Sequence, residues 1–191
     1  MDTQAVLDFW FLPPTDAGYG QSRVEWFRKD DAFDALIVQR FGDLIVTAIA
    51  GGLRDWEATP QGTLARIIVL DQLTRNAFRD TPQAFAGDAQ ALALARQLTQ
   101  AGGDQSLLPM QRAFAYLPFE HAEDVAMQAR AVQLFQHLSQ EHAGFDGMFD
   151  YALRHQEVIK RFGRFPHRNA ILGRPSTPEE TDFLRQPGFS F

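Results

Sequence analysis

The chain has 191 residues, of which 45% are hydrophobic and 22% charged, a composition that is ordinary for a globular protein and excludes a largely disordered one. Its formal net charge of -6 argues against broad nucleic-acid binding, because domains that bind nucleic acids are usually basic. The absence of cysteine excludes disulfides, thiolate metal sites and cysteine nucleophiles.

Neither a targeting segment nor a membrane span is predicted. The start of the chain, Met1 to Trp10, has no basic region and no long apolar run, so it does not resemble a signal peptide. The most apolar stretch, Leu44 to Ala50, is far too short to cross a bilayer. We therefore expect a soluble, cytoplasmic protein without membrane contact.

Hydrophobic spacing is helical along almost the whole chain, and no strand-like alternation stands out. It predicts an all-α fold of about eight helices, joined by mostly short connections and packed as antiparallel helical hairpins. No linker is visible, so residues 1–191 are expected to form a single all-helical domain. In chain order, the predicted helices cover Thr3–Phe11, about 30–49, Thr63–Phe78, 88 to about 101, about Pro109–Tyr116, from just after Pro118 to about His142, Phe149–Phe162, and a segment after Pro178.

Phenylalanine is unusually frequent. The chain has 17 Phe against 3 Trp and 3 Tyr, which predicts a core built largely from rings that need no hydrogen-bond partner. Such a helical domain is also compatible with a homodimer.

Two charges lie on the apolar face of the helix predicted from Thr63. Asp71 and Arg75 are four residues apart, so they can pair directly, and Arg79 follows one turn later. One interpretation is a buried ion pair that orients the helix. The other is that Asp71 holds Arg75 so that it faces a cleft.

The helix predicted after Pro118 places His121, Asp124 and Gln128 on an otherwise apolar face. A lone histidine there is usually a satisfied core residue, whereas the three together form a polar patch. The group lacks the paired histidines that make a zinc assignment credible, so we expect no metal, and the sequence implies no cofactor.

The segment that follows Phe162 is the most informative part of the sequence. From Val158 to Pro178 there are four arginines and Lys160 but no acidic residue. Gly163 and Pro166 predict an irregular loop after the helix. Positive charge on a loop of this kind suits an anion or a carboxylate. In the alternative interpretation, the arginines cap helix carbonyls and bridge neighbouring helices. The loop presents Arg164, His167, Arg168 and Asn169.

Three segments together, 70–79 (LDQLTRNAFR), 116–121 (YLPFEH) and 161–169 (RFGRFPHRN), are similar to a widespread bacterial family known as a domain of unknown function, the nine-hundred-and-twenty-fourth of that series. Residues 6–11 (VLDFWF) and 26–27 (WF) resemble it too. The resemblance implies an all-helical fold similar to tetratricopeptide-like arrays. It implies no reaction and no catalytic residues.

These observations favour a non-enzymatic binding protein for a small anion or an acidic peptide segment. The expected ligand-binding residues are Arg75, Arg79, His121, Arg164, His167, Arg168 and Asn169. The alternative is an enzyme, a hydrolase or phosphoryl-transfer catalyst, that acts on an anionic substrate. Its general acid or base would be His121 or His167, with Asp71, Glu120, Glu123 or Asp124 as orienting carboxylates. In a third interpretation the protein has a structural or protein-partner role, and the loop only braces helices.

Overall fold

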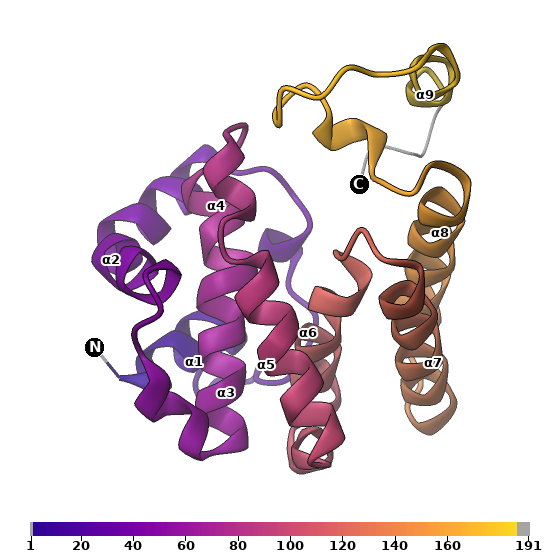
Figure 1. The fold of residues 1–191 in the computed structure, drawn as a ribbon. Helices are drawn as coiled ribbons and strands as arrows, with labels where there is room; N and C mark the ends of the chain where they lie inside the picture. The colour runs from indigo at the N-terminus through magenta and orange to yellow at the C-terminus, as the bar shows by residue number, and fades with distance from the viewer. Residues whose placement is uncertain (1, 187–191) are drawn as a thin grey trace. The chain divides into compact units, whose positions relative to one another are not determined.

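The computed structural model describes residues 2–186, and within them the chain forms helices and turns but no strand. The all-α prediction is therefore confirmed (Figure 1). None of the helices between residues 2 and 186 has the length and apolar character needed to cross a membrane. The α-helices are α1 (Thr3–Phe11), α2 (Asp31–Ile49), α3 (Pro60–Ile67), α4 (Thr74–Ala77), α5 (Asp88–Gln100), α6 (Pro109–Glu120), α7 (Val125–Glu141), α8 (Asp146–Phe162) and α9 (Pro178–Leu184).

A π-helical segment, η3 (Ile68–Leu73), joins α3 to α4 without a break, so the described residues contain eight continuous helices, as expected. This joined helix is buried along nearly its whole length. The wider turn of the π segment lets the Thr74 hydroxyl donate to the carbonyl oxygen of Val69 at 2.8 Å. Irregularities of this kind are frequent at functional sites, and Asp71 lies within this one.

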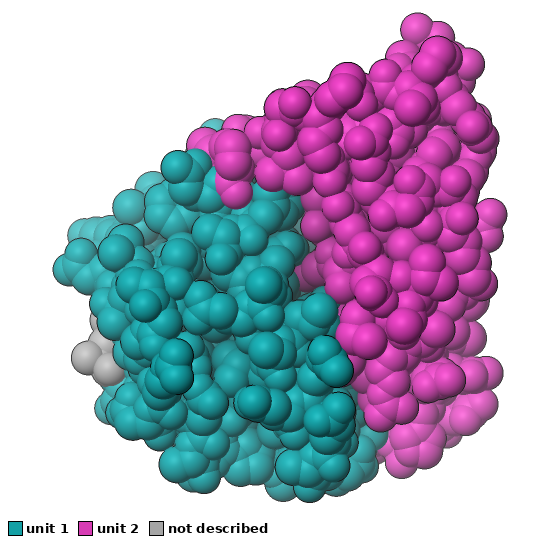
Figure 2. Space-filling view, in the orientation of Figure 1, with its two compact units in different colours: residues 1–79, 83–118 teal, residues 80–82, 119–191 magenta. Residues whose placement is uncertain are grey.

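The chain divides into two compact units (Figure 2). Unit 1 contains residues 1–79 and 83–118, and unit 2 contains residues 80–82 and 119–191. The division falls inside α6, directly after Pro118. That all 191 residues form one domain stays a prediction, as does the likeness to tetratricopeptide arrays.

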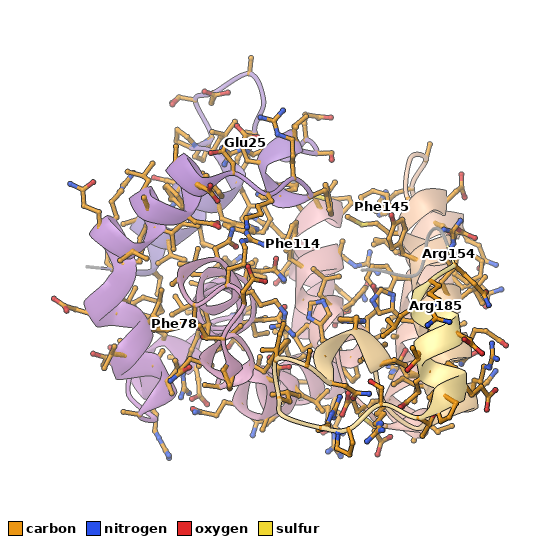
Figure 3. The ribbon with its side chains drawn as sticks, turned by 90° about the horizontal axis from the view of Figure 1, so that it is seen from above. Glu25, Phe78, Phe114, Phe145, Arg154 and Arg185 are labelled. Atoms are coloured by element: carbon orange, nitrogen blue, oxygen red, sulfur yellow. The ribbon has the colours of Figure 1, made fainter. Side chains whose placement is uncertain are left out.

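Aromatic side chains form much of the core of unit 1, as the phenylalanine content predicts. Phe114 of α6, labelled in Figure 3, is buried. Its ring meets three others edge-on. Its ring centroid lies 5.6 Å from that of Trp10, 5.4 Å from Phe11 and 4.6 Å from Trp26. Edge-to-face contacts at such distances are the favourable geometry for aromatic rings.

In unit 2, α7 and α8 pack against each other as a helical hairpin (Figure 1). The far end of α8 carries a small apolar core made by Val158, Ile159, Phe165 and Phe183. Phe165 comes from the loop after α8 and Phe183 from α9, so this core fixes the segment from 163 to 184 onto α8.

Several helix boundaries differ from the prediction. The helix expected from Thr63 begins at Pro60, because Thr59 provides the cap: its hydroxyl accepts the amide of Gly62 at 3.1 Å. The helix expected to stop before Pro118 continues to Glu120. Asp124, expected on a helical face, caps α7 instead, because its carboxylate accepts the amides of Ala126 and Met127.

As a result, His121 lies in the connection between α6 and α7, and the proposed helical stripe of His121, Asp124 and Gln128 is wrong. The physical cause of this difference is local. The first amides of α7 have no partner within the helix, and Asp124 accepts their hydrogen bonds instead of lying on the helical face.

Alanine substitutions at two glycines, Gly87 beside η3 and Gly42 in α2, test how closely the chain packs against η3. A Cβ at Gly87 would lie 2.1 Å from the carbonyl oxygen of Leu70, whereas one at Gly42 in α2 would meet nothing within 4 Å. Gly87→Ala should lower the free energy of unfolding by about 1–3 kcal/mol, because the backbone must move apart. Gly42→Ala should raise it by up to about 1 kcal/mol, since alanine favours a helix. Urea denaturation measures both, and equal effects would contradict the close contact.

Candidate functional site

The predicted site residues of unit 1 are bound to carboxylates. Nη1 of Arg75 lies 3.0 Å from Oδ1 of Asp71, as predicted, and Arg75 also binds both oxygens of Asp88 at 2.9 and 3.0 Å. Arg79 binds both oxygens of Asp34 at 2.6 and 3.0 Å. Burial alone would lower the pKa of Arg75, but the two carboxylates outweigh it and raise this pKa. The pairing of Asp71 with Arg75 is thus confirmed.

In unit 2, the loop after α8 begins as the sequence predicts. Gly163 ends α8 in the left-handed conformation, with φ of 69°, and a short 3-10 turn, η6 (Pro166–Arg168), follows. Arg164 forms a bidentate pair with Glu180 of α9, through Nε at 2.7 Å and Nη2 at 2.9 Å. The same Nη2 donates to the carbonyl oxygen of Pro175 at 2.9 Å. The Arg164 side chain therefore ties the loop to α9.

Asn169 and Glu180 form the buried part of this network. The side chain of Asn169 donates to the Ser176 hydroxyl at 3.0 Å and to Glu180 at 3.3 Å, and it accepts from Nε of Arg174 at 3.0 Å. The Arg164 guanidinium is the main reason that the pKa of Glu180 falls to about 2. Burial opposes this shift, and the Thr177 amide and Asn169 support it.

A second bidentate pair closes the loop from the other side. Nη1 and Nη2 of Arg174 bind the two oxygens of Glu123 at 2.6 and 2.9 Å. Glu123 also accepts the amide of Phe165 at 2.8 Å, and Arg174 donates to the carbonyl oxygen of Phe165 at 3.1 Å. The backbone of Phe165 is thus held on both sides by one ion pair.

Phe165 is the centre around which the polar side chains of the loop gather. Its ring is fully buried. The Arg168 guanidinium lies over it, 4.5 Å from the ring centroid. The imidazole rings of His167 and His155 have centroids 5.5 and 5.4 Å away. His155 comes from α8, so two elements of unit 2 contribute to the cluster.

Both imidazoles have a lowered pKa, and burial is the largest cause in each case. Burial, followed in size by the neighbouring charge of Arg168, lowers the pKa of His167 to about 4; Glu123 opposes this shift, and His121 adds to it. The pKa of His155 falls to about 3, mainly through burial and with smaller contributions from His121, His167 and Arg168. His121, His155, His167 and Arg168 therefore lie near one another.

The orientation of His155 is fixed by two oxygen atoms. Its Nδ1 lies 2.9 Å from the carbonyl oxygen of Tyr151 and 3.2 Å from Oε1 of the buried Glu120. A carbonyl can only accept, so Nδ1 carries the hydrogen and Nε2 has the lone pair. With a pKa of about 3, His155 is neutral at pH 7, so the Glu120 carboxylate lies 3.2 Å from an uncharged ring.

The connection that carries His121 is held by Gln128 of α7, whose Nε2 donates to the carbonyl oxygens of Glu120 at 2.6 Å and Ala122 at 2.8 Å. Gln128 was predicted as part of a polar face. It acts instead on the backbone at both sides of His121.

Within the part of the chain that the structure describes, no three histidine and carboxylate side chains are grouped so that they could hold a metal ion. The structure brings together His121, His167 and Arg168, and it joins Arg164 to Asn169 through Glu180. Arg75 and Arg79 belong to unit 1, and a site that they share with the loop residues stays a prediction.

The sequence did not predict which acidic residues pair with the arginines of the loop. The segment from 158 to 178 contains no acidic residue, but Glu123 and Glu180 come from outside it. Glu180 had a visible signal, the Thr-x-x-Glu pattern of a capping box, which the structure contains at Thr177 and Glu180. Phe165 and the contact of His155 with Glu120 had no comparable signal.

The lowered pKa of Glu180 predicts an acid-dependent loss of stability. Its pKa is about 2 in the folded protein against an ordinary 4.5, so the unfolded chain takes up the proton first as the pH falls. The stabilising contribution is complete above the ordinary pKa and is lost as the pH falls through the folded one. The difference in unfolding free energy between the wild type and Glu180→Gln should therefore shrink from pH 5 towards pH 2.

Urea denaturation at several pH values measures this difference. The control is Glu179→Gln, which removes the exposed neighbouring carboxylate that binds Arg161, and it should change stability little at any pH. A difference for Glu180→Gln that stays constant with pH would contradict the assignment.

Comparison with known proteins places the chain in a family. The sequence pattern of the family described as bacterial protein of unknown function, DUF924, matches residues 6–188. A solved structure of a protein of unknown function, ATU0120 from Agrobacterium tumefaciens, is similar over 96% of each chain, with 38% identity and a TM-score of 0.82. No curated protein matches. With nearly all of its length matched, the chain belongs to the bacterial DUF924 family.

Proposed function

We propose that this protein binds a small anion through the cluster formed by His121, His167 and Arg168 in unit 2. The observation that supports this proposal is the gathering of a guanidinium and imidazoles around Phe165. After burial, the charge of Arg168 is among the causes that lower the pKa of His155 and His167, so it disfavours a second positive charge there. An anion at this place would relieve that repulsion and accept hydrogen bonds from a guanidinium and imidazoles.

The two ion pairs define the role of the remaining loop residues. Arg164 and Asn169 are engaged with Glu180, and Arg174 with Glu123, so they position the loop. Glu123 faces His167 closely enough to act on its pKa, but its charge is balanced by Arg174. We assign recognition to His121, His167 and Arg168 because they gather around Phe165, and this set is smaller than the one that the sequence predicts.

Inorganic phosphate, with sodium chloride at equal ionic strength as a reference, is a direct probe. In histidine NMR titrations, phosphate should raise the pKa of His167 from about 4, because the anion favours the charged ring. His167→Gln should weaken phosphate binding at least about tenfold, the effect of losing one hydrogen bond to a charged group.

The matched control is His137→Gln, which changes an exposed histidine of α7 and should leave the affinity unchanged. Equal effects of phosphate and chloride on His167, or equal affinities of the wild type and His167→Gln, would contradict the proposal. An acidic peptide that binds where phosphate does not would assign the cluster to a peptide.

A second candidate function rests on the contact between Glu120 and His155. A carboxylate that fixes an imidazole and leaves Nε2 to accept a proton is the arrangement of a general base. In this version the protein is a hydrolase or phosphoryl-transfer enzyme for an anionic substrate, with His121, His167 and Arg168 holding the anion. Asp124 caps α7 and Asp71 pairs with Arg75, so Glu120 is the carboxylate suited to orient the base.

Turnover on a panel of phosphate monoesters and carboxylic esters tests this candidate. Activity should disappear in His155→Gln and in His121→Ala and persist in His137→Gln, with circular dichroism confirming that each variant is folded. Because the pKa of His155 is about 3, kcat/KM should be flat between pH 5 and pH 8. Activity that survives in both His155→Gln and His121→Ala would remove the candidate.

A further inference from the structure

The connection between α1 and α2, residues 12–30, is long for a helical protein and contains only a short 3-10 turn, η1 (Val24–Trp26). Connections between packed helices usually have about 2–8 residues, and those beyond about 12–15 commonly serve a function. Figure 3 shows Glu25 on this connection. It belongs to unit 1 and is separate from the histidine cluster of unit 2.

The connection is anchored at defined points. Nη1 of Arg23 donates to the carbonyl oxygens of Phe9 at 2.7 Å and Trp10 at 2.8 Å, and the indole of Trp26 donates to the Trp10 oxygen at 3.1 Å. These bonds satisfy carbonyls at the end of α1 that have no partner within the helix. They fix the base of the connection and commit Arg23 to a structural role.

The backbone is strained where the connection leaves α1. Leu12 has φ of 67° and ψ of 158°, a conformation that favours glycine. Strain of this kind persists where the surroundings enforce it, and it is concentrated at ligand sites. Gly18 packs so closely that an added Cβ would lie 2.9 Å from the Leu12 side chain. The position of the Leu12 side chain is therefore fixed.

Leu12 lines a pocket of about 570 Å³, a volume within the usual range of small-molecule sites. Leu12 and Val24 give it an apolar side, and Val24 is 69% exposed. Gln21 and Ser22 add neutral polar groups, and within the described residues their side chains make no hydrogen bond. An apolar wall beside polar groups without a fixed bond is suited to a ligand with both characters.

Four charged side chains also line the pocket, and two of them, Arg28 and Glu25, are only loosely paired. Nη2 of Arg28 lies 3.9 Å from Asp30, whose other oxygen caps α2, and the Arg28 side chain is 72% exposed. Glu25 lies 3.5 Å from Arg23. Strong hydrogen bonds between ionised groups have lengths of about 2.7–2.9 Å, so Arg28 and Glu25 can each exchange a weak contact for a ligand.

We infer that this pocket binds a small zwitterion of the amino-acid type. Its carboxylate would pair with Arg28, its ammonium group with Glu25, and its apolar side chain would lie against Leu12 and Val24. The pair of opposite charges favours this class of ligand. A simple anion would be repelled by the nearby Glu25 carboxylate, and a simple cation would be repelled by the Arg28 guanidinium. The inference is independent of the anion site in unit 2.

Isothermal titration with three related probes tests it on the full chain. L-leucine carries both charges, leucinamide lacks the carboxylate, and N-acetyl-leucine lacks the ammonium group. L-leucine should bind, and each of the others should bind at least about tenfold more weakly, since each loses a charge-assisted contact.

Arg28→Gln should weaken the binding of L-leucine at least about tenfold, and this variant should bind L-leucine and leucinamide with equal affinity. Glu25→Gln should bind L-leucine and N-acetyl-leucine with equal affinity. The control is Arg96→Gln, an exposed arginine of α5 in the same unit, which should bind like the wild type. Both substituted side chains of the pocket are solvent-exposed, so the variants are expected to fold.

Failure of L-leucine to bind the wild type, or equal affinities in the wild type and Arg28→Gln, would overturn the inference. The same titration with His167→Gln should match the wild type. This result separates the pocket from the phosphate site, because either can fail while the other stands.

Discussion

Two bidentate ion pairs, Arg164 with Glu180 and Arg174 with Glu123, hold the loop that follows α8. Each pair joins residues far apart in the sequence, and together they bind the backbone of Phe165 and the side chain of Asn169. Fork-like guanidinium contacts of this kind fix direction as well as distance. The position of Phe165, and with it the cluster of imidazoles around its ring, depends on these pairs.

Most arginines of the loop hold it in place, and they are not the residues that we propose bind the ligand. A run of arginines on a loop suggests an anion site, yet most of these guanidinium groups are engaged by carboxylates that come from other elements. Arg168 lies over the Phe165 ring, beside two imidazoles of lowered pKa.

The sequence predicts most of the helices and little of the side-chain network. Local signals were sufficient for α1, for the end of α8 at Gly163 and for the pair of Asp71 and Arg75, because cap residues and i,i+4 spacing act over a few positions. They failed where partners are distant. Glu123 meets Arg174 only after the chain has folded, and no periodicity reports such a contact. The missed role of Asp124 has a different cause, because its capping of α7 is a local contact that competed with a helical-face interpretation.

Hydrogen exchange at the Phe165 amide tests the central claim most directly, because this amide donates to Glu123 at 2.8 Å. If the Glu123–Arg174 pair holds Phe165, Arg174→Gln should speed exchange of this amide by about tenfold or more and leave the amides of α2 unchanged. Arg161→Gln, which removes an exposed pair with Glu179, should have no such effect. Unaltered protection of the Phe165 amide in Arg174→Gln would contradict the account.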